Sequence, residues 1–308
     1  SPRSRTPTPP PAAHDDRRSP MTALGFLTGG RQRTTATPAA GRLRSAAGDR
    51  LALGALAVLV ALALLAPLVS PHSPVLRSGE AFLSPGSPGH PLGTDALGYD
   101  LLARVLYGMR ASLFAAAVVI ASGVLVGGVV GVLAGALPGW ADSALMRVTD
   151  LFLALPGLVI AMAVAASLGA SYHSALIGIA VVWWPMYARL VRGEIRAWAA
   201  RPHLEAARLA GVPWGRRVVR HLLPGVRSTI VVAASLDVGS LVVALSALSF
   251  VGLSSPAPAP ELGAMAAQGM PYLLTSWWVP IVPGIAVMLL ALVANYAGDA
   301  VRDLLRRR

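Results

Sequence analysis

The chain contains no cysteine and no lysine, so all 26 of its basic residues are arginine. Without cysteine it cannot form disulfides, thiolate metal sites or a cysteine nucleophile. Without lysine it cannot build a P-loop, whose lysine contacts the phosphates of a nucleotide, or form a Schiff base. The sequence therefore excludes thiol chemistry and ATP hydrolysis by a P-loop within this chain.

Charge of either sign is also scarce, because Asp, Glu, Lys and Arg make up 13% of the 308 residues while 55% are hydrophobic. A soluble chain of this length needs more charge to cover its surface, so the composition indicates a polytopic membrane protein. A net charge of +12 is compatible with nucleic-acid binding. However, the arginines gather at the ends of apolar segments instead of on a soluble domain, so we expect no nucleic-acid partner.

Six apolar segments reach or approach the roughly 20 residues that a helix needs to cross a bilayer. They are residues 51–69, 111–137, 151–170, 175–187 (with some extension), 228–253 and 277–297. The first lacks a small-residue cleavage site, which favours a span over a removed signal peptide. The sequence predicts an all-α membrane protein with six transmembrane helices.

This pattern divides the chain into three parts. Residues 1–50 are rich in Pro, Ser, Thr and Arg without apolar periodicity, which predicts a disordered tail. Residues 51–105 would form the first transmembrane helix and an outer loop. Residues 106–308 would form a five-helix domain that includes a polar loop at 192–224.

A four-residue glycine spacing marks the second apolar segment, at Gly123, Gly127, Gly131 and Gly135. This spacing lines one face of a helix with glycine and allows another helix to approach closely. We expect this face to serve helix packing, with pore lining as the alternative.

The arginine distribution predicts the orientation of the chain. Nine arginines precede the first span, one lies at Arg147, nine lie between Arg189 and Arg227, and four follow from Arg302. Only Arg77, Arg104 and Arg110 fall on the other side. By the positive-inside rule, both termini and the 192–224 loop face the cytoplasm.

The 192–224 loop has the pattern of two short helices. Pro202 can open the first helix, and Gly211 can end it at the position that often needs a left-handed residue. Glu205 lies near the positive end of that helix, and Ala206 and Ala207 keep it slim enough for a partner to approach its backbone. An ordinary interfacial helical loop is the alternative.

Pro213 suits the first turn of the second helix. The sequence that follows predicts one apolar face made of Val218, Val219, Leu222 and Leu223.

The loop resembles the EAA motif of ABC importer permeases, which reads Glu-Ala-Ala-x3-Gly-x9-Ile-x-Leu-Pro. Here the motif consists of Glu205, Ala206, Ala207, Gly211, Leu223 and Pro224. His221 stands at the isoleucine position, and a histidine there is familiar from the dipeptide, oligopeptide and nickel branch of the family.

Three further stretches resemble the same branch in the same order. Residues 92–100 read Leu-Gly-Thr-Asp-Ala-Leu-Gly-Tyr-Asp, with Tyr99 in place of the usual arginine. Residues 247–253 read Ala-Leu-Ser-Phe-Val-Gly-Leu, and residues 298–303 read Gly-Asp-Ala-Val-Arg-Asp. The resemblance covers about residues 90–304, and four spaced motifs together make it specific.

The resemblance implies a type I ABC importer permease in a bacterial inner membrane, with Glu205–Gly211 as the coupling helix. The implied partners are a homologous second permease subunit, two ATP-binding subunits, an extracytoplasmic substrate-binding protein and membrane lipid. ATP and Mg²⁺ would bind the partner subunits, so we expect no cofactor and no catalytic residue in this chain. Peptides are the expected cargo, with nickel or a metal chelate as the alternative. A passive channel and a membrane-embedded enzyme are rivals from other classes.

Asp237 is the only acidic residue deep in a predicted span, and intramembrane carboxylates are functional candidates. With Ser235 and Ser240 it would line the translocation path, or it would bond to the second permease subunit.

The outer side carries scattered polar residues. Asp95 and Asp100, with Arg104 and Arg110, are expected to form a salt-bridge cap on a loop rather than a peptide or metal contact. His72, His90 and His173 lack metal-ligand spacing, so the sequence predicts no metal site. The loop at 254–276 is a candidate contact for a substrate-delivery protein.

Overall fold

The computed structural model describes residues 46–137, 139–254 and 256–306. Most of the predicted tail at 1–50 lies outside the described residues, and its last residues belong to the first helix. The described residues form helices and loops with two isolated β-bridges, Ser87 with His90 and Thr94 with Asp100, and contain no named strand. The all-α prediction is confirmed.

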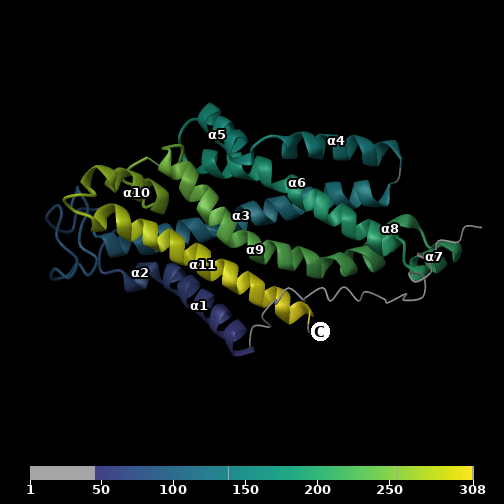
Figure 1. Ribbon diagram of the computed structural model, residues 1–308, viewed down its shortest axis with the longest axis horizontal. Coiled ribbons are helices and arrows are strands. Elements are labelled where there is room, and N and C mark those ends of the chain that lie inside the picture. Colours follow the sequence, from purple (N-terminus) through teal and green to yellow (C-terminus); the bar gives the residue numbers. More distant parts are fainter. Residues whose placement is uncertain (1–45, 138, 255, 307–308) are drawn as a thin grey trace, which may run out of the picture. The chain divides into compact units, whose positions relative to one another are not determined.

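The helices follow one another along the chain as shown in Figure 1. They are α1 (Ala46–Leu64), α2 (Ala66–Val69), α3 (Leu101–Ala136), α4 (Trp140–Ala154), α5 (Gly157–Leu168), α6 (Tyr172–Ala199), α7 (Pro202–Leu209), α8 (Trp214–Arg217), the π-helix η1 (Val218–Leu222), α9 (Leu223–Phe250), α10 (Leu262–Gly269), the 3₁₀-helix η2 (Met270–Tyr272) and α11 (Trp278–Arg306).

Among the described residues, five stretches of helix are long and apolar enough to cross a membrane, and the bent pair α4–α5 makes a sixth candidate span. Helices α3, α9 and α11 extend the predicted segments at one end, because the hydropathy pattern omits the polar turns that continue each helix. The predicted first span, 51–69, is instead divided at Leu65 into α1 and α2. The short fourth segment extends as expected, and its helix α6 tolerates Pro185 in its interior.

The third predicted span, 151–170, is two helices instead of one. The axes of α4 and α5 differ by 87°, and the break falls at Leu155 and Pro156. Proline lacks an N–H for the helix ladder and pushes the preceding residue out of the helical region. Leu155 accordingly has φ −100° and ψ 148°, which is extended backbone.

The glycine face of α3 packs against α6, as expected. A Cβ atom at Gly127 would lie 2.3 Å from the carbonyl oxygen of Trp184, and one at Gly131 would lie 2.6 Å from that of Ala188. A Cβ atom at Gly123 would meet the side chain of Tyr187 at 3.2 Å, and one at Gly135 would meet the side chain of Ile195 at 2.7 Å. The packing interpretation is confirmed, because only glycine lets the two backbones approach this closely.

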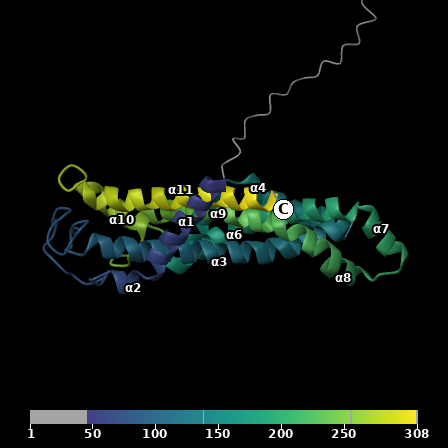
Figure 2. The same cartoon turned by 90° about the horizontal axis from the view of Figure 1, so that it is seen from below.

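Three apolar clusters hold the bundle together. One joins α3, α5, α6 and α9, and a second joins α1, α3, α9, α10 and α11. The third joins α6, α7, η1 and α9 at the end of the bundle that carries α7 (Figure 2). Residues 70–100 lie at the opposite end of the bundle from α7.

Residues 70–100 form an irregular loop whose turns depend on glycine. Gly93 and Gly98 both have φ +79°, in the left-handed region that favours glycine. A Cβ atom at Gly93 would lie 2.4 Å from the carbonyl oxygen of Leu83, and one at Gly98 would lie 2.4 Å from that of Gly79. The Leu-Gly-Thr-Asp segment is therefore a folding motif that closes this loop onto itself.

Candidate coupling loop and polar residues of the bundle

Helix α7 forms where the sequence predicts it and ends as predicted. It begins at Pro202, and Gly211 adopts φ +75° directly beyond its end. The N–H of Val212 donates to the carbonyl of Ala207 at 3.1 Å, which closes the left-handed turn that commonly ends helices at glycine.

The two faces of α7 have different surroundings. Leu204 is 5% exposed and packs into the third apolar cluster beside Val191 and Ile195 of α6. Glu205 and Ala206 are exposed, and Leu209 is 84% exposed. One leucine therefore anchors α7 to the bundle, while a carboxylate, a small side chain and a second leucine remain accessible.

Leu223 and Pro224 lie at a junction within a continuous helical segment, Trp214–Phe250. Helix α8 begins directly after Pro213 and passes through η1 into α9. Leu223 and Pro224 are the first two residues of α9, and both are exposed.

The sequence predicts that four residues of this segment share one apolar face, and this prediction is wrong for two of them. Val218 and Leu222 are buried in the third cluster, but Val219 is 66% exposed and Leu223 is 39% exposed. The N–H of Leu223 donates to the carbonyl of Val218, five residues back, which is the π-helical pattern. A π-turn changes which residues share a face, so reasoning from the α-helical period fails there.

A tryptophan supports the base of α7. The guanidinium of Arg201 lies 3.5 Å from the ring centroid of Trp198. Gly225 packs on the same indole, since a Cβ atom there would lie 2.4 Å from Trp198 Cε2. The chain therefore enters α7 beside a tryptophan ring of α6 that packs against α9.

An ion-pair cluster that the sequence analysis missed joins α4 to α6. The buried carboxylate of Asp142 accepts hydrogen bonds from Arg192 Nε at 2.5 Å and Arg192 Nη2 at 2.9 Å, and it also pairs with Arg196. Such two-point pairs fix orientation as well as charge. The four-residue spacing of the two arginines, which puts them on one helix face, was the available signal.

Asp237 lies on α9 and faces α6. Its Oδ2 accepts a hydrogen bond from Trp183 Nε1 at 3.0 Å, and the aspartate is half-buried. The two serines do not join it. Ser235 donates to the carbonyl of Val232 in its own helix, and Ser240 is exposed.

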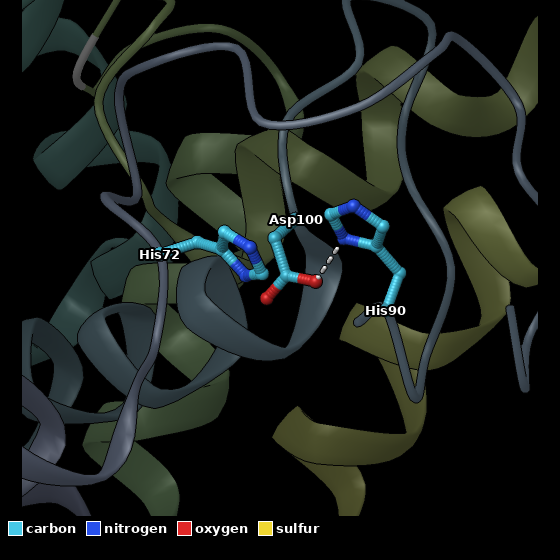
Figure 3. A group of neighbouring side chains, drawn as sticks. All are labelled: His72, His90 and Asp100. Atoms are coloured by element: carbon cyan, nitrogen blue, oxygen red, sulfur yellow. Dashed lines mark hydrogen bonds and ion pairs between the residues drawn. The ribbon is translucent and has the colours of Figure 1, made fainter. Parts of the chain in front are cut away.

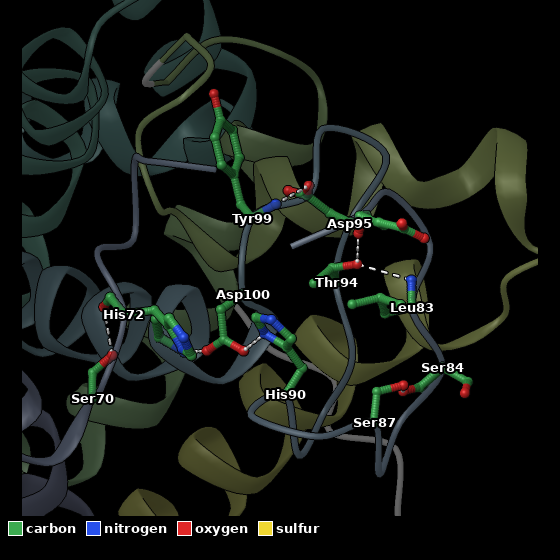
Figure 4. A network of polar contacts seen from close by, with 12 residues as sticks. Ser70, His72, Leu83, Ser84, Ser87, His90, Thr94, Asp95, Tyr99 and Asp100 are labelled. Carbon is green, nitrogen blue, oxygen red and sulfur yellow. Dashed lines mark hydrogen bonds and ion pairs between the residues drawn. The ribbon is translucent and has the colours of Figure 1, made fainter. Parts of the chain in front are cut away.

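Arg104 and Asp95 form the core of the loop cap that the sequence predicts. Arg104 Nε lies 3.6 Å from Asp95 Oδ2, and Arg104 Nη1 donates to the carbonyls of Pro74 and Pro258. Asp95 also accepts from two backbone N–H groups of its turn (Figure 4). Arg110 forms no ion pair among the described residues.

Asp100 pairs with histidine instead of arginine. His90 Nδ1 lies 2.9 Å from Asp100 Oδ1, and the His72 ring lies on the other side of the same carboxylate (Figure 3). His173, at the start of α6, is not part of this group. Two of the three histidines that appear scattered along the sequence are therefore neighbours in the structure.

The two remaining motifs also have structural roles. At the end of α9, Gly252 has φ +86°, its N–H donates to Ser249, and the N–H of Leu253 donates to Leu248. In α11, Gly298 packs on the backbone of Ser235, and Arg302 lies 3.1 Å from Asp299. The first motif ends a helix. The second lets α11 pack closely against α9 and adds an ion pair to the last turns of α11.

Comparison with known proteins shows the family of this chain. Residues 127–308 match the family described as binding-protein-dependent transport system inner membrane component. The chain is 40% identical over 253 residues to a probable D,D-dipeptide transport system permease protein, DdpC, of Escherichia coli, covering 81% of this chain and 85% of the relative. It is 36% identical to the di/tripeptide transport system permease protein DppC of Pseudomonas aeruginosa, covering 85% and 89% of the two chains.

A third relative is the glutathione transport system permease protein GsiD of Pectobacterium atrosepticum, which is 37% identical over 71% of this chain and 73% of its own length. Among solved structures, the MetNI methionine ABC transporter in inward-facing conformations matches with a TM-score of 0.53 and 21% identity. That match covers 65% of this chain and 95% of the other, and it supports the fold. The chain is a translocation component of a transport system in the bacterial inner membrane, and it belongs to the binding-protein-dependent transport system inner membrane component family.

Proposed function

We propose that this chain is one of two permease subunits of an ATP-driven peptide importer. The three relatives above are named for D,D-dipeptides, di/tripeptides and glutathione, which favours peptides over the alternative cargo, nickel or a metal chelate. The second permease subunit, two ATP-binding subunits and an extracytoplasmic binding protein would complete the complex. ATP and Mg²⁺ would bind the ATP-binding subunits.

The structure of α7 carries this proposal. Leu209 is exposed on a short helix beside the exposed Glu205 and Ala206, although the same helix is anchored through the buried Leu204. A helix that is fixed on one face and presents a small apolar and acidic surface on the other is suited to a groove in a partner protein. We assign α7 as the coupling helix, with Ala207 and Gly211 setting its thickness and its end.

The anchor gives α7 a mechanical connection to two spans. Leu204 shares its cluster with residues of α6 and of α9, so displacement of α7 would move both helices. Further along the bundle, Trp183 on α6 and Asp237 on α9 are joined by a hydrogen bond. Closure of the ATP-binding subunits would shift α6 and α9 together and switch the bundle between two states.

The arginine count supports the orientation. With 23 of 26 arginines on one side, α7 and both termini would face the cytoplasm. The loops at 70–100 and 254–276 would then face outward, where a binding protein delivers cargo. Asp237 and the exposed Ser240 remain candidates for the translocation path, whereas Ser235 packs toward α11.

Co-purification of the full chain from mild detergent tests this function. We expect recovery of a second permease, ATP-binding subunits and a peptide-binding protein. Leu209→Asp should lose the ATP-binding subunits, while Leu274→Asp, which changes a leucine that is 98% exposed outside α7, should retain them. Recovery of the wild-type chain alone would contradict the importer assignment, and equal recovery with both variants would contradict the role of α7.

A further inference from the structure

Three side chains from separate segments converge at the end of the bundle opposite α7. His72 follows α2, His90 lies in the loop, and Asp100 is the N-cap residue of α3. Their nitrogen and oxygen ligand atoms all lie within 4.8 Å of one another. Figure 3 shows the two imidazole rings on either side of the carboxylate, and their centroids are 4.8 Å apart.

The carboxylate is buried and needs compensation for its charge. Asp100 is fully buried and His90 is 5% exposed. The Oδ2 atom of Asp100 accepts a hydrogen bond from the N–H of Ala103 at 2.8 Å, which leaves Oδ1 facing His90 Nδ1. Within residues 46–137, 139–254 and 256–306, no arginine pairs with Asp100, because the nearby Arg104 pairs with Asp95.

His72 adds an unused ligand atom. Its Nδ1 atom is buried and makes no hydrogen bond within the part of the chain that the structure describes. Buried polar atoms without a partner are uncommon in native structures, and a role in binding an ion is one explanation.

The donor set matches a transition-metal site. Two neutral imidazoles and one carboxylate are the protein ligands of open tetrahedral zinc centres. With bonds of about 2.0–2.1 Å, ligand atoms around tetrahedral Zn²⁺ lie roughly 3.3 Å apart. The 2.9 Å separation of His90 from Asp100 and the 4.8 Å upper limit bracket that value. The two imidazole rings are stacked with their planes 21° apart, so they would have to rotate for both ring nitrogens to bind one ion. The Ala103 N–H would orient the liganding carboxylate from behind.

We propose that His72, His90 and Asp100 bind a divalent transition-metal ion, with Zn²⁺ as the best fit, and that this ion clamps the loop. Imidazole nitrogen favours Zn²⁺ over Ca²⁺ and Mg²⁺, which prefer oxygen ligands. Water would occupy the fourth position. The ion would tie the segment after α2 and the turn at His90 to the start of α3, and so stabilise the surface formed by residues 70–100.

The test uses the full chain, purified with its co-purifying subunits in detergent without nucleotide and stripped with EDTA. Zinc chloride is then added, free metal is removed by gel filtration, and bound zinc is measured by mass spectrometry alongside the melting temperature. The variants are His72→Gln and His90→Gln, and the matched control is His173→Gln, because His173 lies outside the cluster.

We expect wild type and His173→Gln to retain zinc and to melt at a higher temperature after zinc is added. His72→Gln and His90→Gln should bind zinc at least about tenfold more weakly, as expected when a metal site loses a ligand. No retained zinc in wild type would overturn the proposal, as would equal zinc and equal thermal shifts in His72→Gln and wild type. If His90→Gln does not assemble, the comparison of wild type with His72→Gln decides the outcome, because His72 is only half-buried.

Discussion

Trp183 on α6 donates its indole N–H to the carboxylate of Asp237 on α9 at 3.0 Å. This bond links the two helices that also hold α7 through the third apolar cluster. In a predicted membrane span a half-buried carboxylate is costly without such a donor.

Trp183→Phe keeps most of the ring but removes that donor. We expect the free energy of unfolding to fall by about 1–3 kcal/mol, because a half-buried carboxylate loses a hydrogen-bond donor. Thermal unfolding of the purified protein in detergent measures the effect. Trp277→Phe, at a ring that is 53% exposed, is the control and should change little. Equal melting temperatures for both variants would show that the bond contributes nothing to stability.

Gly127→Ala should disrupt the contact between α3 and α6. The added Cβ atom would lie 2.3 Å from the carbonyl oxygen of Trp184, so the helices must separate. Overpacking of this kind costs about 1–3 kcal/mol, which a lower melting temperature would report. Gly128→Ala is the matched control, because a Cβ atom at the neighbouring Gly128 meets nothing within 4 Å. A tolerated Gly127→Ala would contradict close packing on this face.

Glu205→Lys should abolish uptake of a labelled dipeptide while the chain still inserts in the membrane. The substitution reverses the exposed charge in the first turn of α7, where a carboxylate is favoured, and should weaken binding of the ATP-binding subunits. Co-purification and uptake are measured together. Glu80→Lys makes the same charge change at an exposed site in the 70–100 loop and should retain those subunits. Normal uptake by Glu205→Lys would contradict the assignment of α7 as the coupling helix.

Glu261→Gln should make stability less dependent on pH. The Glu261 carboxylate caps α10 by accepting from the N–H of Ala264 at 2.8 Å, and burial raises the pKa of this carboxyl. A raised pKa in the folded state contributes stability that is fully present below the unfolded pKa of about 4.3 and is lost as pH rises through the folded pKa.

Melting temperatures of wild type and Glu261→Gln across that pH range test this effect. The glutamine oxygen can still accept from Ala264, so the variant should lose less stability than wild type as pH rises. Glu80→Gln, at an exposed glutamate, is the control and should follow wild type. Parallel curves for all three proteins would show that the pKa of Glu261 does not differ between the folded and unfolded states.

The spans and motifs were predictable because their causes are local. Apolar runs are visible in the sequence, and Gly211 ends α7 through its own backbone angle. The same holds for the glycine face of α3, whose spacing alone indicates close packing. Even so, the sequence does not identify the partner helix, because that depends on contacts with Trp184 and Ala188 far along the chain.

Other features depend on relations that a linear pattern does not contain. Hydropathy reports that 151–170 is apolar but not that Pro156 turns the helix by 87°. The π-turn at η1 changes the buried face between Val218 and Leu223, which a fixed α-helical period misses. His72 and His90 lie side by side because the loop between them turns at Gly86 and Gly89, so their sequence separation gave no sign of proximity.

The length of α3 affects how far residues 70–100 lie from the membrane. Its 36 residues, at about 1.5 Å each, give a rod of about 54 Å, while the hydrocarbon core is about 30 Å thick. Tilt absorbs part of the difference, but the turns around Arg104 and Arg110 would still extend beyond the hydrocarbon core. The 70–100 loop, which packs around the tip of this rod, would meet ions and proteins from the aqueous phase, so reagents that do not cross membranes should reach it in spheroplasts.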